Sequence, residues 1–277
     1  MTAVNLKEVL IPALNKGYAI AGLVVQGWED AIAYVEAAEE NKIPIILQAG
    51  PGCRKHTPIP VIGKMFRYLA DKADIPIVCH IDHGYTYEEC LEGIEHGFTS
   101  VMFDGSTLPI SKNIDITAKV VEKANQSNVS VEGEVGFVGY FEGKESRGTD
   151  PNEAAKFNKE SGADALAISV GNVHLQKNKI SNINIDLIRA IEKVTNIPLV
   201  LHGGSGISIP QRIELARNTN VCKFNIGTEI RIMFGNSLRK KINSDSNVYD
   251  RIEILKTTIS DVKTLTSEII KEFGPSK

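Results

Sequence analysis

Short apolar runs rich in β-branched residues recur along the chain, and the stretches between them have apolar residues at helical spacing. Eight of the runs are predicted to be strands, at residues 19–25, 43–48, 75–81, 100–103, 129–135, 165–169, 197–202 and 221–225. Between two of them, Ala31, Val35 and Ala38 repeat at the three-to-four-residue interval of a helix that buries one face. The pattern therefore predicts strands alternating with helices along nearly the whole chain.

This alternation favours parallel strands joined by right-handed helical crossovers. The predicted strands are nearly continuous apolar runs, which is typical of strands buried on both faces. Eight such units in 277 residues suit an α/β fold of the closed (β/α)₈ barrel type, with a doubly wound open sheet as the alternative. No linker or low-complexity tract divides the sequence, so residues 1–277 are predicted to form a single domain.

The segment after the eighth strand is predicted to be a C-terminal helical extension. Between Tyr249 and Glu272, the residues Ile252, Leu255 and Ile259 follow helical spacing. Because one face of this segment is apolar, we expect it to pack on the barrel or on a second subunit.

Composition excludes several classes of partner. The net charge is −3 and the chain has no basic block, so we expect neither nucleic acid nor a membrane surface as a partner. Lys7 and Glu8 interrupt the N-terminal stretch, so we expect no secretory signal, and no apolar run approaches the length of a membrane span. The four cysteines lack C-x-x-C spacing, which favours a reduced, cytoplasmic protein and gives them no metal role.

Polar residues gather where the predicted strands end. These are Gln48, His80 to His83, Asp104, Glu132, Glu134, His174, His202 and Asn225. In a barrel, the carboxyl ends of the strands share one mouth, and active sites are built there. The sequence therefore predicts one site at this mouth.

Three histidines of this set are candidate metal ligands. His83, His174 and His202 each end or follow a strand. Three neutral imidazoles with one open position are typical of a catalytic zinc site. Taken singly, each is better explained as an ordinary core or surface histidine, but together they favour zinc.

Asp82 stands beside His83 in the sequence His-Ile-Asp-His-Gly at residues 80–84. A carboxylate at this position can exchange a proton with a bound substrate. It could instead cap the helix that starts near Tyr87, or orient a metal histidine. His80 is interpreted either as orienting a ligand or as a packed core residue.

Glu132 and Glu134 fall on one face of the fifth strand because side chains alternate. Two acids facing the interior of a barrel require a cation or hydrogen bonds. A metal position shared by Glu134 and Asp104 would satisfy that requirement, and so would an internal salt bridge.

Two glycine-rich turns follow the seventh and eighth strands. They are Gly203-Gly204-Ser205-Gly206 and Asn225-Ile226-Gly227-Thr228. Glycine lets backbone N–H groups approach an anion, and barrels commonly hold phosphate at these two positions. The turns are therefore predicted to bind a phosphate group.

Four blocks carry a family resemblance. They are residues 78–84, 100–106, 131–136 together with Glu142, and 198–206. With them, the chain resembles the class II, zinc-dependent ketose-bisphosphate aldolases of the fructose- and tagatose-bisphosphate type over nearly its whole length. Such enzymes reversibly cleave a phosphorylated ketose, such as fructose or tagatose 1,6-bisphosphate, into dihydroxyacetone phosphate and an aldehyde.

The resemblance implies roles for individual residues. It implies that His83, His174 and His202 bind Zn²⁺, with Asp104 and Glu134 at a second, movable position for a divalent or monovalent cation. It implies that Asp82 is the acid–base residue and that Glu142, from a loop, protonates the enediolate carbon. The triose phosphate would be held by Gly203, Gly204, Ser205, Asn225, Gly227 and Thr228, and the distal phosphate by Arg231. We further expect a homodimer or homotetramer.

Several positions depart from the family pattern. They are Leu23 and Val24, Gly50, Tyr140, Leu175, Lys177 and Gly227. These replace common substrate contacts, so we expect a ketose phosphate with a less polar portion to be preferred over fructose 1,6-bisphosphate. The alternatives are a Schiff-base aldolase using Lys223, a metal-dependent hydrolase, and a non-catalytic relative.

Overall fold

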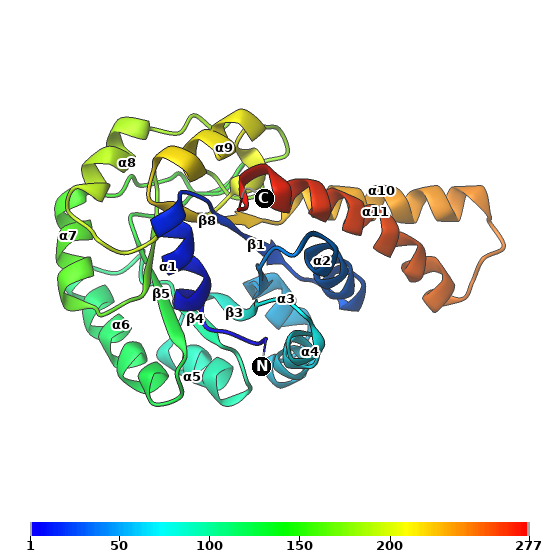
Figure 1. Ribbon diagram of the computed structural model, residues 1–277, viewed down its shortest axis with the longest axis horizontal. Coiled ribbons are helices and arrows are strands. Elements are labelled where there is room, and N and C mark those ends of the chain that lie inside the picture. Colours follow the sequence, from blue (N-terminus) through cyan, green and yellow to red (C-terminus); the bar gives the residue numbers. More distant parts are fainter. Residues whose placement is uncertain (1, 276–277) are drawn as a thin grey trace.

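The computed structural model describes residues 2–275 as a closed barrel of eight parallel strands surrounded by helices (Figure 1). The strands are β1 Ile20–Val24, β2 Ile45–Ala49, β3 Ile77–Gly84, β4 Ser100–Phe103, β5 Ser130–Val135, β6 Ala165–Ile168, β7 Leu199–Leu201 and β8 Val221–Ile226. The ring closes where β1 pairs with β8, with Gly22 opposite Asn225. All eight predicted strands and the (β/α)₈ barrel are confirmed, and the open-sheet alternative is excluded.

Helices cover the outside of the barrel. They are α2 Trp28–Asn41, α3 Pro51–His56, α4 Ile59–Lys72, α5 Tyr87–Glu95, α6 Ile110–Asn125, α7 Pro151–Glu160, α8 Ile185–Glu192 and α9 Ile209–Asn218. The strand residues are buried almost without exception, because helices pack on one face and the barrel interior fills the other. This double burial explains the continuous apolar runs in the sequence.

Helix α1, Leu6–Lys16, closes the amino-terminal end of the barrel. It begins with a capping box between Asn5 and Glu8, and it ends at Gly17, whose φ of 65° suits glycine. Its apolar face packs with the lowest layer of interior side chains, which includes Ile20 and Val78. Because α1 covers this end, the carboxyl ends of the strands form the open end of the barrel.

The last two helices form an arm that projects from the barrel (Figure 1). They are α10 Thr228–Ser244 and α11 Arg251–Phe273. The second half of α11 packs on the barrel through buried residues such as Val262 and Phe273, whereas Ile252 at its start is 75% exposed. The predicted extension is therefore helical, and only its second half lies on the barrel.

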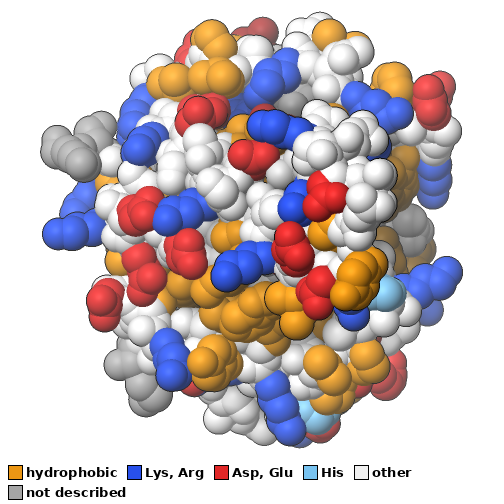
Figure 2. Space-filling view, turned by 90° about the vertical axis from the view of Figure 1, so that its right-hand side faces the viewer, with side chains coloured by type: hydrophobic (Ala, Val, Ile, Leu, Met, Phe, Trp, Pro, Cys, Tyr) orange, Lys and Arg blue, Asp and Glu red, His pale blue; other side chains and the backbone are white. Residues whose placement is uncertain are grey.

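The face from which the arm projects carries apolar side chains across its middle and lower part (Figure 2). Exposed apolar residues in this region of the fold include Ile232 and Ile242 of α10. Within residues 2–275, no helix combines the length and the apolar character needed to cross a membrane.

Candidate active site

A cavity of about 310 Å³ lies at the carboxyl ends of the strands. Most of the predicted site residues line it, namely Asp82, His83, His174, Gly203, Ser205, Asn225, Gly227, Thr228 and Arg231. His202 and Glu134 lie deeper, with 0% and 1% of their surfaces exposed. The barrel therefore brings residues that are up to 149 positions apart into one site, from Asp82 to Arg231.

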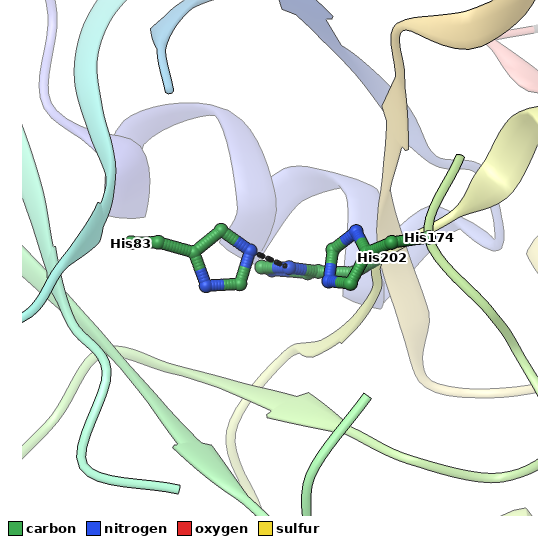
Figure 3. Close-up of side chains that lie close together, drawn as sticks. All are labelled: His83, His174 and His202. Atoms are coloured by element: carbon green, nitrogen blue, oxygen red, sulfur yellow. Dashed lines mark hydrogen bonds between the residues drawn. The ribbon is translucent and has the colours of Figure 1, made fainter. Parts of the chain in front are cut away.

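The three predicted ligand histidines converge, as Figure 3 shows. The ring centroid of His83 lies 5.0 Å from that of His174 and 4.5 Å from that of His202. Nδ1 of His202 and Nε2 of His83 are 2.8 Å apart, and ligand atoms of all three lie within 4.8 Å of one another. Nε2 of His174 is buried without a hydrogen-bond partner among residues 2–275. Three facing nitrogens, one of them orphaned, suit a metal ion.

Glu132 fixes the orientation of His202 from inside the barrel. One carboxylate oxygen of Glu132 lies 3.1 Å from Nε2 of His202, and the other accepts a hydrogen bond from Lys223 at 2.6 Å. A histidine whose one nitrogen is held by a carboxylate presents the other to a metal. The two glutamates predicted to share a face therefore act separately, because Glu132 belongs to this internal ion pair.

His80 belongs to the same buried network. Its Nδ1 lies 2.8 Å from the hydroxyl of Ser100, and its Nε2 lies 3.3 Å from Nζ of Lys223. Burial holds the pKa of His80 well below its usual range. Within residues 2–275, His80 is thus connected to His202 through Lys223 and Glu132.

A second cluster joins His83 to two acids. Nδ1 of His83 lies 2.7 Å from Oδ2 of Asp104 and 3.8 Å from Oε2 of Glu134. Oε2 of Glu134 is buried without a hydrogen-bond partner in the described chain, and burial raises the pKa of Glu134 well above its usual range. The three side chains also meet the geometric requirement for holding a cation.

In the absence of a bound cation, His83 favours its protonated form. Burial acts to lower its pKa, but the carboxylates of Asp82 and Asp104 raise it to about 10. Burial and the nearby His83 lower the pKa of both His174 and His202. A metal cation would replace this proton among the same carboxylates.

Asp82 is 5% exposed and accepts a hydrogen bond from the amide of Asn225 at 3.0 Å. Burial acts to raise its pKa, but His83 and His202 outweigh this and lower it. Helix α5 is capped by Thr86, whose hydroxyl accepts from the N–H of Glu89. The alternative interpretation of Asp82 as the cap of this helix is therefore wrong, and its carboxylate is free to face the cavity.

Comparisons with known proteins agree with this geometry. The family described as fructose-bisphosphate aldolase class-II matches residues 4–277. The chain belongs to the class II fructose-bisphosphate aldolase family. It is 36% identical to the fructose-bisphosphate aldolase of Geobacillus stearothermophilus over 100% of this chain and 98% of that protein. It is also 36% identical to the fructose-bisphosphate aldolase of Staphylococcus aureus strain COL, over 100% and 99% of the two chains.

Solved structures give the same result. The YdjI aldolase of Escherichia coli K12 superposes with a TM-score of 0.86 at 30% identity, over 98% of this chain and 97% of that one. A putative fructose-1,6-biphosphate aldolase of Coccidioides immitis has a TM-score of 0.84 at 20% identity, over 99% and 97%, which supports the fold alone. The predicted class II aldolase family is confirmed.

Two turns of this class II family member meet at the predicted phosphate position. The hydroxyl of Ser205 accepts hydrogen bonds from the N–H groups of Gly227 and Glu229, both at 3.3 Å. Gly203 has a φ of 66°, and a Cβ there would lie 2.2 Å from the carbonyl oxygen of Val173. The amino terminus of the 17-residue helix α10 also faces the cavity at Thr228. The positive potential at this helix end, next to two glycine-containing turns, suits a phosphate.

Gly204 differs from its neighbours. It does not line the cavity, and a Cβ there would lie 2.8 Å from the side chain of Ile226 and 3.0 Å from the carbonyl of Asn225. Its absent side chain therefore allows the two turns to pack together.

Glu142 lies outside the cavity. It is exposed, has a φ of 59° and is not among the lining residues. The loop that carries it is tied to His174, since the ring of Tyr140 stacks on the His174 ring at 4.9 Å between centroids and the N–H of Phe141 donates to the His174 carbonyl. Tyr140 thus lies where the sequence marked a departure from the family, and it covers one side of a predicted ligand.

Most of the remaining departures lie at the cavity. Val24, Gly50, Leu175 and Gly227 line it, whereas Lys177 lines a neighbouring surface recess and Leu23 is buried in the hydrophobic core. Leu175 has a φ of 60°, a left-handed conformation that favours glycine. Sequence reasoning did not identify Arg54, a buried arginine beside Asp82 and His83.

Proposed function

We propose that this chain is a zinc-dependent aldolase that reversibly cleaves a phosphorylated ketose into dihydroxyacetone phosphate and an aldehyde. The observation that carries the proposal is the convergence of three histidines and an ionised aspartate on a cavity bounded by two phosphate-type turns. A hydrolase would not need both turns. The Schiff-base alternative lacks support because Lys223 is fully buried and paired with Glu132.

The proposed zinc ligands are His83, His174 and His202. A second cation, divalent or monovalent, would be held by Asp104 and Glu134 beside His83. The orphaned Nε2 of His174 and Oε2 of Glu134 support both positions, since a buried polar atom without a partner is costly. When bound, zinc would supply a Lewis acid that polarises the ketose carbonyl.

Asp82 is the proposed acid–base residue. In its ionised form, it removes the proton from the hydroxyl whose oxygen becomes the aldehyde of the cleaved half. The hydrogen bond from Asn225 holds one of its oxygens in the cavity while the other remains available.

Glu142 is the proposed proton donor to the enediolate carbon. Because Glu142 is exposed and outside the cavity, this role requires the loop between β5 and α7 to close over bound substrate. Closure would also exclude water from the reacting carbons.

The triose phosphate would lie against the two turns after β7 and β8, where Gly203, Ser205, Gly227 and Thr228 line the cavity. Arg231 would bind the distal phosphate, and its buried Nε, which has no hydrogen-bond partner among residues 2–275, supports this. Phosphate contacts far from the reacting carbons supply orientation.

The preferred ketose is proposed to be less polar than fructose 1,6-bisphosphate. Val24 and Leu175 present apolar surface to the cavity, and Gly50 offers no hydroxyl. Beyond Arg231, a cavity of about 580 Å³ adjoins the site, and its lining mixes apolar side chains such as Phe234 with charged ones such as Asp30 and Arg251. The apolar surface of Val24 and Leu175 favours a substrate portion with fewer hydroxyl groups.

The remaining proposals concern assembly and location. The exposed apolar residues on the arm support a homodimer or homotetramer. The four cysteines, all buried free thiols, support a cytoplasmic location.

Chelation and trapping test the chemistry. A chelator should abolish ketose-phosphate cleavage, measured with a coupled assay for triose phosphate, and added Zn²⁺ should restore it. Borohydride with substrate should trap no covalent adduct. A lysine adduct, or full activity in a metal-free preparation, would overturn the proposal. Screening ketose mono- and bisphosphates in the same assay identifies the substrate.

A further inference from the structure

Two consecutive residues of β3 face the same cavity, which a regular strand does not allow. Asp82 and His83 both line the active-site cavity, whereas successive side chains of a strand point to opposite faces. The pairing of β3 with β4 shifts register between Ile81 and Gly84, and His83 has a φ of 54°. This bulge turns both side chains toward the site.

The bulge lies beyond the paired part of the sheet on its other side. The register of β3 with β2 ends where Ala49 meets Ile81. Carbonyl groups at such a break need donors from elsewhere, because buried backbone acceptors are costly when unpaired. The carbonyls of Asp82 and His83 are the ones concerned.

Arg54 of α3 supplies these donors. Its guanidinium donates to the carbonyl of Asp82 at 2.6 Å, to the carbonyl of His83 at 2.7 Å, and to the carbonyl of Ala49. Its Nε donates to Glu89 of α5 at 2.8 Å, and only 4% of the side chain is exposed. Glu89 in turn accepts the N–H of Tyr85. One planar cation thus holds both ends of the bulge.

We propose that Arg54 is a positioning residue that maintains the β3 bulge and thereby aims Asp82 and His83 at the same bound atoms. Arg54 does not touch the imidazole of His83 or the carboxylate of Asp82. It acts on their backbone, and its fork of donors matches several carbonyls at once, which lysine cannot do. The metal part of this role rests on the zinc site proposed above.

The test compares Arg54→Met with Arg217→Met. Arg217 forms a similar clamp, donating to the carbonyls of Gly17 and Gly274, but Gly17 lies at the amino-terminal end of the barrel, away from the site. Zn²⁺ affinity of the apo protein is measured by chelator competition, and the visible spectrum of the Co²⁺ form reports ligand geometry. Arg54→Met should bind Zn²⁺ about 10–100-fold more weakly, in the range typical of residues that orient metal ligands. Its Co²⁺ spectrum should change, and kcat should fall more than KM rises.

Arg217→Met should retain the affinity and the spectrum of the unmodified protein. If Arg54→Met is insoluble, Arg54→Lys decides, since it retains the charge but not the fork and should still weaken Zn²⁺ binding by at least about threefold. Wild-type affinity and spectrum in a folded Arg54 variant would refute the proposal. If the unmodified apo protein binds neither Zn²⁺ nor Co²⁺, the proposed zinc site is refuted instead. An unchanged ratio of kcat to KM in the Arg54 variant would refute the proposal that Arg54 positions Asp82.

Discussion

Asp82 and Glu142 divide the proposed proton transfers, and the structure places them in different environments. Asp82 is buried and accepts from Asn225, whereas Glu142 is exposed on a loop. In the proposed mechanism, the substrate hydroxyl proton is therefore transferred to a fixed group, Asp82. The proton added to the enediolate carbon comes from Glu142, which must first move into position.

Substituting Asp82 by Ala should impair cleavage without removing the metal. We expect kcat to fall about 10²–10⁴-fold, the range for loss of a general acid–base group. Bound zinc, measured by metal analysis, should remain stoichiometric. Exchange of the carbon-bound proton of dihydroxyacetone phosphate, followed by NMR, should survive because Glu142 is intact. Equal loss of exchange and cleavage would mean that Asp82 supports the metal instead.

Asp30 in α2 is predicted to reduce stability at neutral pH. Burial raises its pKa from 3.8 to about 6, against hydrogen bonds from the backbone of Gln26 and Gly27. The folded state thus favours the protonated form of Asp30. The contribution of Asp30 to the free energy of unfolding is therefore fully present below pH 4 and is lost as pH rises through 6. A shift of this size corresponds to about 2–3 kcal/mol.

Asp30→Asn keeps an acceptor oxygen and removes the charge. Its free energy of unfolding in urea, relative to the unmodified protein, should increase by about 2–3 kcal/mol between pH 4 and pH 7. A difference that does not vary with pH would show that Asp30 titrates normally.

At the scale of elements, the loop after β6 combines a proposed zinc ligand with a departure from the family pattern at the cavity. His174 and Leu175 are consecutive, and Leu175 adopts a left-handed conformation. Its side chain is 45% exposed and lines the cavity mouth. Val24 of β1 lines the same cavity. These two elements therefore contribute apolar surface to the proposed substrate cavity.

Combining Val24→Asn with Leu175→Gly should improve the use of fructose 1,6-bisphosphate. The amide restores a partner for a substrate hydroxyl, and the glycine lets backbone approach a phosphate without left-handed strain. We expect kcat/KM for this sugar to rise about 10–100-fold in the coupled assay. The matched control is Lys177→Ala, which alters a neighbouring recess but not the cavity lining. If the unmodified protein already uses fructose 1,6-bisphosphate best, the departures do not determine specificity.

At the scale of the whole molecule, the most exposed of the large apolar side chains lie at the far end of the arm. Tyr249 and Ile252 are 93% and 75% exposed there, and Ile242 is 45% exposed, whereas Val61 and Tyr68 of α4 on the barrel are 56% and 53% exposed. An arm that leaves apolar residues in solvent at its far end suits contact with a second copy of the chain.

Ile252→Glu should therefore weaken self-association. We expect sedimentation equilibrium to show the unmodified protein as a dimer or tetramer, and the variant to dissociate at least about tenfold more readily, since a buried unpaired charge is costly. Ile180→Glu is the control, because Ile180 is 65% exposed on the loop between β6 and α8 and not on the arm. A monomeric unmodified protein, or equal effects of both variants, would exclude the arm as the interface.

Local pattern and family motif together determined the barrel, its eight strands and most of the site. Parallel strands buried on both faces leave continuous apolar runs in the sequence, and the barrel geometry then assigns every strand end to one mouth. Residues such as His83, His202 and Asn225 could therefore be predicted to meet. The departure at Leu175 was visible from the family pattern, whereas its left-handed conformation was known only from the structure.

Only the tertiary structure decided how these residues are held. The bulge that turns Asp82 and His83 the same way depends on the pairing of β3 with β4 and on Arg54 from another element. Glu132 and Glu134 belong to different clusters because Glu132 pairs with Lys223, which lies 91 positions away in the sequence. Such contacts join segments far apart in the chain, and neither periodicity nor motif spacing records them. The same holds for Glu142, whose distance from the cavity is set by the path of a loop and not by its place in a motif.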